Sequence, residues 1–236
     1  ERPSPNFNGR PDGAAIDMLV LHYTGMPLAE DALARLCDPA AEVSAHYLID
    51  EDGTVTALVP EAKRAWHAGH SAWQGRVRLN DCSIGIELVN PGHEWGYRRF
   101  TEAQYQALID LGRGLVRRWP IPAARVLGHS DVAPARKQDP GELFDWRRLA
   151  RAGIGLWPED GAGAPRPLET TLSQLVEIGY PNAGRVTITA FQRHFRPERI
   201  DQFYCQSPQL DPVPPQVVLK STKHPSDLLY GPLRRL

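Results

Sequence analysis

Three side chains that could bind one metal ion stand far apart in the sequence. His22 lies in an apolar stretch, His129 follows a glycine, and Asp139 comes ten residues after His129. Two neutral imidazoles and one carboxylate leave a tetrahedral Zn²⁺ with one open position for water, whereas structural zinc sites are usually closed by four protein ligands. A single histidine on an apolar strand is more often an ordinary core residue. The three residues together therefore predict a catalytic zinc site.

Two charged residues in the same regions could complete a hydrolase. Glu87 stands inside the apolar run 84–89, and Lys137 precedes Asp139 by two positions. A desolvated glutamate has a raised pKa that suits a general base, and an ammonium near the metal can stabilise an oxyanion. We expect these two catalytic roles. The alternatives are a structural ion pair for Glu87 and a solvated surface position for Lys137.

Strands and helices alternate along residues 17–152, which predicts an α/β fold. Apolar runs predict the strands, helical spacing predicts the helices, and Thr101 with Gln104 predicts a capping box at the start of the longest helix. Residues 61–81 show no periodicity and are expected to form a long loop. The expected strands are Asp17–Tyr23, Ser44–Asp50, Thr54–Pro60, Cys82–Asn90 and Val126–Gly128, and the expected helices are Leu28–Cys37, Thr101–Trp119 and Leu143–Ala152.

The composition changes after this region. Residues 157–167 are rich in Gly, Pro and Ala and predict a linker between a domain of residues 1–156 and a second unit with few contacts across it. Helical spacing in Leu168–Gly179 and Arg185–Arg196 predicts a small helical domain over residues 168–205. Six prolines in residues 206–236 predict a tail without a third helix, because proline breaks helix interiors.

Five stretches in the first domain resemble type-2 N-acetylmuramoyl-L-alanine amidases, whose fold is shared with peptidoglycan recognition proteins. They occur in the family's order and are Leu19–Thr24, Val43–Ile49, Ala65–Gly69, Ser83–Asn90 and the segment from Gly128–Pro134 to Asp139–Gly141. The resemblance implies a mixed central β-sheet flanked by helices. Residues 178–180 and 190–195 resemble a small peptidoglycan-binding domain.

The resemblance implies a bacterial zinc amidase that cleaves the bond between N-acetylmuramic acid, or its 1,6-anhydro form, and L-alanine. It supports Glu87 and Lys137 as catalytic residues. It also implies that Tyr47 contacts the substrate; of His46 and Tyr47, which point to opposite faces of one strand, only one can reach the site. Trp66, His67 and Asn90 are further candidates for binding a sugar ring or a stem peptide. His70, His93, His194 and His224 match no ligand position, and we expect them at the surface.

Other functions remain open at this point. A peptidoglycan recognition protein without activity would lack a zinc ligand, a zinc peptidase would cut between amino acids, and a structural envelope protein would need no such site. A net charge of −1 gives no indication of nucleic acid binding. No apolar run is long enough for a transmembrane segment, and no signal peptide is visible. We expect a monomer and leave the compartment open between the cytoplasm and the periplasm or cell envelope.

Overall fold

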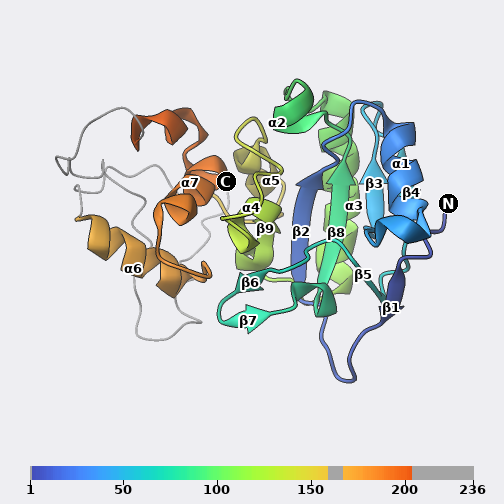
Figure 1. The fold of residues 1–236 in the computed structure, drawn as a ribbon, viewed down its shortest axis with the longest axis horizontal. Helices are drawn as coiled ribbons and strands as arrows, with labels where there is room; N and C mark the ends of the chain where they lie inside the picture. The colour runs from blue at the N-terminus through green and yellow to red at the C-terminus, as the bar shows by residue number, and fades with distance from the viewer. Residues whose placement is uncertain (1, 159–166, 204–236) are drawn as a thin grey trace.

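A mixed β-sheet forms the centre of the computed structural model, which describes residues 2–158 and 167–203 (Figure 1). The five strands lie in the order β4 (Val55–Ala57), β3 (Tyr47–Ile49), β8 (Ser83–Leu88), β2 (Met18–Tyr23) and β9 (Val126–Gly128). Strands β3, β8, β2 and β9 are parallel, and β4 pairs antiparallel with β3. This arrangement confirms the predicted mixed sheet.

One face of the sheet carries the main apolar core. Leu19 and Leu21 of β2 point to this face, together with alternate residues of β8, because side chains alternate along a strand. Helices α3 (Glu102–Arg118) and α5 (Trp146–Arg151) cover it. The predicted capping box of α3 is present: Gln104 N donates to Thr101 Oγ1 at 3.1 Å, and Thr101 N donates to Gln104 Oε1 at 3.0 Å.

The opposite face is covered at its two sides by different helices. Helix α1 (Ala29–Cys37) packs through Leu36 against Leu48 of β3. On the other side, Val20 of β2 and Leu127 of β9 lie under the C-terminal helices. Figure 1 shows α1 at one side of the sheet and α6 and α7 at the other. His22 and Glu87 also belong to this face, between the two groups of helices.

Residues 61–81 are more ordered than the sequence predicts. They contain β5 (Lys63–Ala65), β6 (Ala72–Trp73), β7 (Arg76–Val77) and the 3-10 turn Leu79–Asp81. Strand β5 pairs with the N-terminal strand β1 (Phe7–Gly9), and β6 pairs with β7. Strands of two or three residues are too short to show an alternating pattern, which explains why the expected loop was only partly correct. Short helical segments complete this half: Pro39–Ala41, α2 (Gly92–Trp95), Ala123–Arg125 and α4 (His129–Val132).

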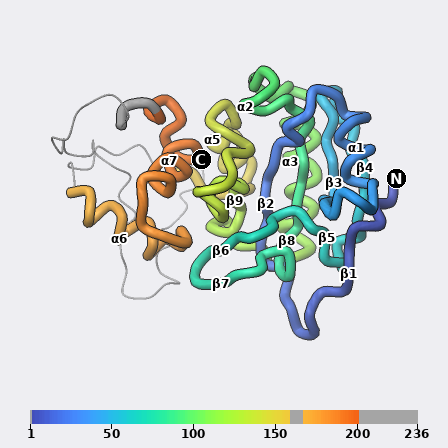
Figure 2. The backbone as a smooth tube through the Cα atoms, viewed as in Figure 1, coloured from blue at the N-terminus to red at the C-terminus, as the bar shows by residue number. Residues whose placement is uncertain are grey.

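Two helices form beyond residue 167 as predicted, α6 (Leu168–Ile178) and α7 (Arg185–Phe195), followed by the 3-10 segment Pro197–Phe203. The expected Pro-rich tail lies outside the described residues. In the described part of the chain, no helix has the length and apolar character needed to cross a membrane. In Figure 2 both helices lie on the side of the sheet that ends with β9.

The C-terminal helices share an apolar cluster with the sheet. Leu175 and Phe191 belong to one buried group with Val20, Leu127 and Val132. The side chain of Trp73 meets the ring of Tyr180 edge to face at 4.9 Å between centroids. The expectation of few contacts between the two halves is therefore wrong. The apolar side chains of α6 and α7 belong to one cluster with the sheet face and α4.

A buried carboxylate joins the same two parts. Asp131 of α4 is fully buried and accepts hydrogen bonds from Gly128 N, Tyr180 Oη and His194 Nδ1, each at 2.7 Å. The imidazole of His194 also stacks on Trp146 at 3.7 Å. His194 was expected at the surface but is buried, because the partners that cover it come from residues far earlier in the chain.

Candidate active site

The carboxyl ends of three parallel strands bring the predicted site residues together. His22 lies near the end of β2, directly opposite Glu87 of β8, and His129 begins α4 immediately after β9. Parallel strands end at the same edge of a sheet, so residues distant in sequence meet there. Asp139 is held beside them because Ser130 N donates to its backbone oxygen at 2.9 Å.

Three potential ligand atoms converge at this edge. His22 Nδ1 lies 2.9 Å from His129 Nδ1 and 3.0 Å from Asp139 Oδ2, and the last two atoms are 3.1 Å apart. All three side chains are buried and form a group that could hold a metal ion. A tetrahedral zinc with ligands at about 2.0–2.2 Å separates ligand atoms by roughly 3.3–3.5 Å. The observed triangle therefore fits zinc after a small expansion.

The outer nitrogens of both imidazoles are occupied by protein groups. His22 Nε2 lies 3.0 Å from His67 Nδ1, and His129 Nε2 lies 3.1 Å from the carbonyl oxygen of Ala68. Burial, and next the proximity of His129, lowers the pKa of His22 to about 4. His22 is thus neutral near pH 7, which is the form that ligates metals.

Glu87 lies beside this cluster with one oxygen deprived of partners. Its Oε2 atom is buried and has no hydrogen-bond partner among the described residues. Burial raises the pKa of Glu87 well above its usual value, and the charge of Asp139 adds to this, whereas Lys137 acts in the opposite direction. A carboxylate in this environment can accept and return a proton near neutral pH.

A cavity of about 360 Å³ connects the cluster to helix α1. The ligand triad, Glu87 and Lys137 all line it, so the expected catalytic groups face one space. Its walls come from the end of β2, helix α1, the α2 region and the loop after α4. Other lining residues are Tyr23, Thr24, Met26, Arg35, Leu36, His93 and Arg136.

Three of the four expected substrate-binding residues are not brought to this cavity. Tyr47 points to the α3 face, where its hydroxyl donates to Glu61 Oε1 at 2.5 Å. Trp66 Nε1 donates to Asn8 at 3.2 Å. Asn90 is buried, donates to the backbone of Arg98 and accepts from the amide of Gly92. Each of the three side chains is therefore bound to another part of the protein and does not line the cavity.

The fourth, His67, lines the cavity but lies behind His22. Its side chain is buried between β8 and the ligand imidazole, and its ring meets that of His22 edge to face. His46 is the member of the pair His46 and Tyr47 that lies on the site face, where its ring meets that of His67. The register of β3 against β8 determines this choice, and no residue pattern within the strand reveals it.

Tyr23 and His93 are among the residues at the cavity wall that were not expected there. Tyr23 Oη lies 2.9 Å from His93 Nδ1, and His93 Nε2 lies 3.2 Å from both carboxylate oxygens of Glu142. Arg193 of α7 contacts the same carboxylate at 3.4 Å. Burial raises the pKa of Tyr23 to about 12, so its hydroxyl stays protonated. The position of Tyr23 directly after His22 was the one sequence signal for this group.

Gly85 provides the space for His67, because a β-carbon at this position would lie 2.4 Å from His67 Cγ. We expect Gly85→Ala to displace the imidazole and to lower the free energy of unfolding by about 1–3 kcal/mol, as overpacking does in a tight core. Chemical denaturation measures this loss. Gly9→Ala is the control, since no atom lies within 4 Å of a β-carbon there. Equal stability of both variants would show that His67 can move freely.

Two histidines and an aspartate converge beside Glu87 at the carboxyl edge of the mixed sheet, an arrangement typical of metal-dependent hydrolases. Comparison with known proteins identifies the family. The family model for N-acetylmuramoyl-L-alanine amidase matches residues 12–142, and the chain belongs to this amidase family of hydrolases.

Curated bacterial relatives agree with this assignment. The N-acetylmuramoyl-L-alanine amidase AmiD of Escherichia coli (strain K12) is 41% identical over 211 residues, which cover 77% of this chain and 75% of AmiD. The 1,6-anhydro-N-acetylmuramyl-L-alanine amidase AmpD of the same organism is 44% identical over 62% of this chain and 87% of AmpD. AmiD thus extends the similarity beyond the segment that matches AmpD.

Solved structures show the same fold. AmiD from E. coli, in complex with the substrate anhydro-N-acetylmuramic acid-L-Ala-D-γ-Glu-L-Lys, superimposes with a TM-score of 0.70 and 36% identity, covering 84% of this chain and 94% of that chain. AmpDh3 from Pseudomonas aeruginosa, in complex with an anhydromuramic pentapeptide, gives a TM-score of 0.72 with 34% identity, covering 81% and 87%.

Proposed function

We propose that this chain is a zinc-dependent amidase that hydrolyses the bond between the lactyl group of N-acetylmuramic acid, or of its 1,6-anhydro form, and L-alanine. The convergence of His22, His129 and Asp139 in the cavity of Glu87 and Lys137 carries the proposal. The muropeptides bound to AmiD and AmpDh3 support this substrate class.

The proposed reaction assigns a role to each group. A zinc ion held by His22, His129 and Asp139 would lower the pKa of water and polarise the scissile carbonyl. Glu87 removes a proton from the attacking water as the new C–O bond forms, and returns it to the amine as the C–N bond breaks. Lys137 stabilises the negative charge that develops on the carbonyl oxygen. The products are the free lactyl carboxylate and an intact stem peptide.

Two other functions compete with this proposal. A recognition protein without activity would not need the unpartnered carboxylate of Glu87, which is costly to bury without a role. A zinc peptidase could use a similar triad but would cut within the stem peptide. The family membership of the chain favours the amidase, and product analysis distinguishes all three functions.

The test joins metal content to product identity. We expect the purified protein to contain about one zinc per chain, to lose activity on chelation and to regain it with Zn²⁺ but not Mg²⁺, which prefers octahedral oxygen ligands. Mass spectrometry of anhydromuramyl-tripeptide digests reports the cleaved bond, and intact sacculi serve as the polymeric substrate. Full activity in protein shown to contain no zinc would contradict the proposal, and a shortened peptide would indicate a peptidase.

The proposal includes a bacterial source, since the named relatives are bacterial, and a monomeric enzyme. We expect it either in the cytoplasm or in the periplasm or cell envelope. The activity on soluble muropeptides relative to sacculi would favour one of them, because recycled fragments and the polymer occur in different places.

A further inference from the structure

We infer that His67 and Ser83 are positioning residues that fix the tautomer of His22, so that its Nδ1 lone pair faces the metal position. This inference rests on the proposed function, since it concerns how the zinc ligands are presented. It assigns His67 a role other than contact with substrate. The hydrogen bonds that carry it run from a backbone carbonyl toward the cavity.

The first hydrogen bond in this series, between Ser83 and Leu79, has only one possible direction. The carbonyl oxygen of Leu79 can only accept a hydrogen bond, so Ser83 Oγ, 2.6 Å away, donates its single proton to it. Ser83 Oγ must therefore act as acceptor toward His67 Nε2, which lies at 3.0 Å. It follows that Nε2 of His67 carries the proton.

The direction then passes from ring to ring. A neutral imidazole has one donor and one acceptor nitrogen, so Nδ1 of His67 is the acceptor. Its partner at 3.0 Å, His22 Nε2, must donate. The remaining nitrogen of His22, Nδ1, keeps a free lone pair and points at His129 Nδ1 and Asp139 Oδ2. The hydroxyl of Ser83, acting through the imidazole of His67, thus determines which nitrogen of His22 is available to the metal.

The same short segment orients the second imidazole ligand. The carbonyl oxygen of Ala68 accepts from His129 Nε2 at 3.1 Å, which leaves Nδ1 of His129 unprotonated. Asn80 Oδ1 holds this segment because it accepts from the amides of His67 at 3.2 Å and Ala68 at 2.8 Å. Residues 67 and 68 therefore orient both histidine ligands. The ring of His67 orients His22, and the carbonyl group of Ala68 orients His129.

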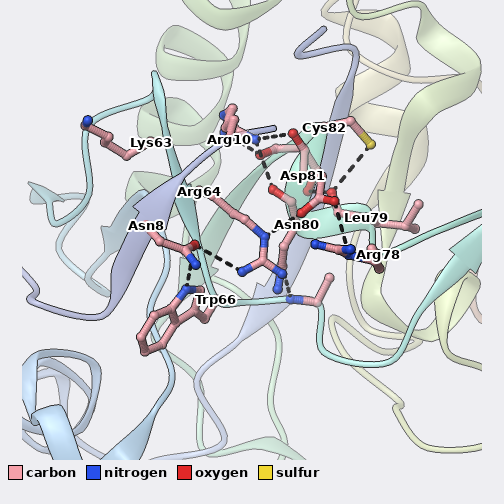
Figure 3. Close-up of polar contacts among 12 residues, drawn as sticks. Asn8, Arg10, Lys63, Arg64, Trp66, Arg78, Leu79, Asn80, Asp81 and Cys82 are labelled. Carbon is pink, nitrogen blue, oxygen red and sulfur yellow. Dashed lines mark hydrogen bonds and ion pairs between the residues drawn. The ribbon is translucent and has the colours of Figure 1, made fainter. Parts of the chain in front are cut away.

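Asn80, which holds this segment, and its neighbour Asp81 are in turn held by two arginine side chains. Arg10 donates to the backbone oxygens of Asn80 and Asp81 at 3.0 Å each, and Arg64 Nε donates to Asp81 Oδ1 at 2.5 Å. Figure 3 shows the side chains of Arg10 and Arg64 beside Asp81, with Asn80 next to them. Such a support restricts rotation and displacement of His67, as orientation of a ligand requires.

Two substitutions of nearly equal shape separate orientation from packing. In His67→Asn, the amide oxygen takes the place of Nδ1 and can still accept from His22 Nε2. In His67→Leu, a side chain of similar volume offers no acceptor. We expect the Leu variant to bind zinc 10–100-fold more weakly, the usual loss when a partner of a ligand is removed, and the Asn variant to stay close to wild type.

The tautomers can be observed directly in the metal-free full-length protein. In ¹⁵N-histidine-labelled samples, long-range ¹H–¹⁵N spectra should show His22 and His67 with the proton on Nε2. Ser83→Ala should shift part of the His67 population to the Nδ1–H form and should weaken zinc binding, measured by chelator competition. The Ser83→Ala spectra also decide the question if His67→Leu fails to fold.

The outcomes distinguish this inference from the proposed function. If wild-type protein binds no zinc, the proposed function fails, while the spectra still judge the tautomers. An Nδ1–H proton on His22, or equal zinc affinity of the folded Asn and Leu variants, overturns the inference even when the amidase activity is established. Tautomers unchanged in Ser83→Ala would show that Ser83 does not fix the tautomer of His22 and would overturn that part of the inference.

Discussion

Exchange of Glu87 for alanine is expected to lower kcat for muropeptide hydrolysis by roughly 10²–10⁴ while zinc content stays unchanged, because this is the usual contribution of a general base. Glu87 lies opposite His22 on the neighbouring strand, yet its carboxylate is not among the converging ligand atoms. Its raised pKa and the unpartnered Oε2 atom indicate a group poised for proton transfer rather than for an ion pair.

The measurement combines steady-state kinetics with metal analysis of the same samples. Glu94→Gln is a matched control because it removes one carboxylate from the lining of the same cavity without touching the strand of Glu87. We expect that control to change kcat little. Loss of zinc from Glu87→Ala would instead identify Glu87 as a ligand and would remove Asp139 from the proposed set.

The longest elements could be predicted closely from the sequence because their signals are local. The capping box and the apolar face of α3 placed its boundaries within one residue of Glu102–Arg118. Apolar runs likewise located β2 and β8. Strands β5, β6 and β7 had no comparable signal, since their partners, and not their own residues, make them strands.

The candidate site divides in the same way. The residue types of His22, His129 and Asp139 are sufficient to predict a metal site, and their side chains do converge. The position of Tyr47 could not be predicted correctly, because strand alternation separates Tyr47 from His46 but does not say which faces the cavity. Pairing with β8 decides that point. The contacts of His67 likewise depend on Gly85, whose missing side chain leaves room for its ring.

Nothing in the local sequence reports how closely the C-terminal helices join the sheet. The linker composition predicted two independent halves, yet Tyr180 and His194 supply two of the three hydrogen-bond donors to Asp131. That carboxylate belongs to α4, the helix that begins with His129. Arg193 also contacts Gln138, which lies between Lys137 and Asp139. Both segments that carry site residues after β9 are therefore held by α7.

A fragment that ends at Pro158 is accordingly expected to be much less stable than the full chain. It would expose the apolar face that includes Val20, Leu127 and Val132. Each large apolar side chain that loses full burial costs roughly 1.5–3 kcal/mol, and typical domains have only about 5–15 kcal/mol of stability in total. It would also leave the Asp131 carboxylate without two of its donors.

Chemical denaturation of three chains tests this expectation: the full chain, the fragment ending at Pro158 and a control ending at Phe203 that retains α6 and α7. We expect the control to unfold near the midpoint of the full chain, and the short fragment to unfold at clearly lower denaturant and to lose zinc affinity through displacement of His129. Tyr180→Phe should reproduce a small part of the effect, about 1–3 kcal/mol, because it leaves a buried acceptor short of one partner. Equal midpoints and equal kcat on soluble muropeptides for all three chains would show instead that residues 2–158 fold and act alone, and that the docked helices serve a purpose outside the catalytic fold.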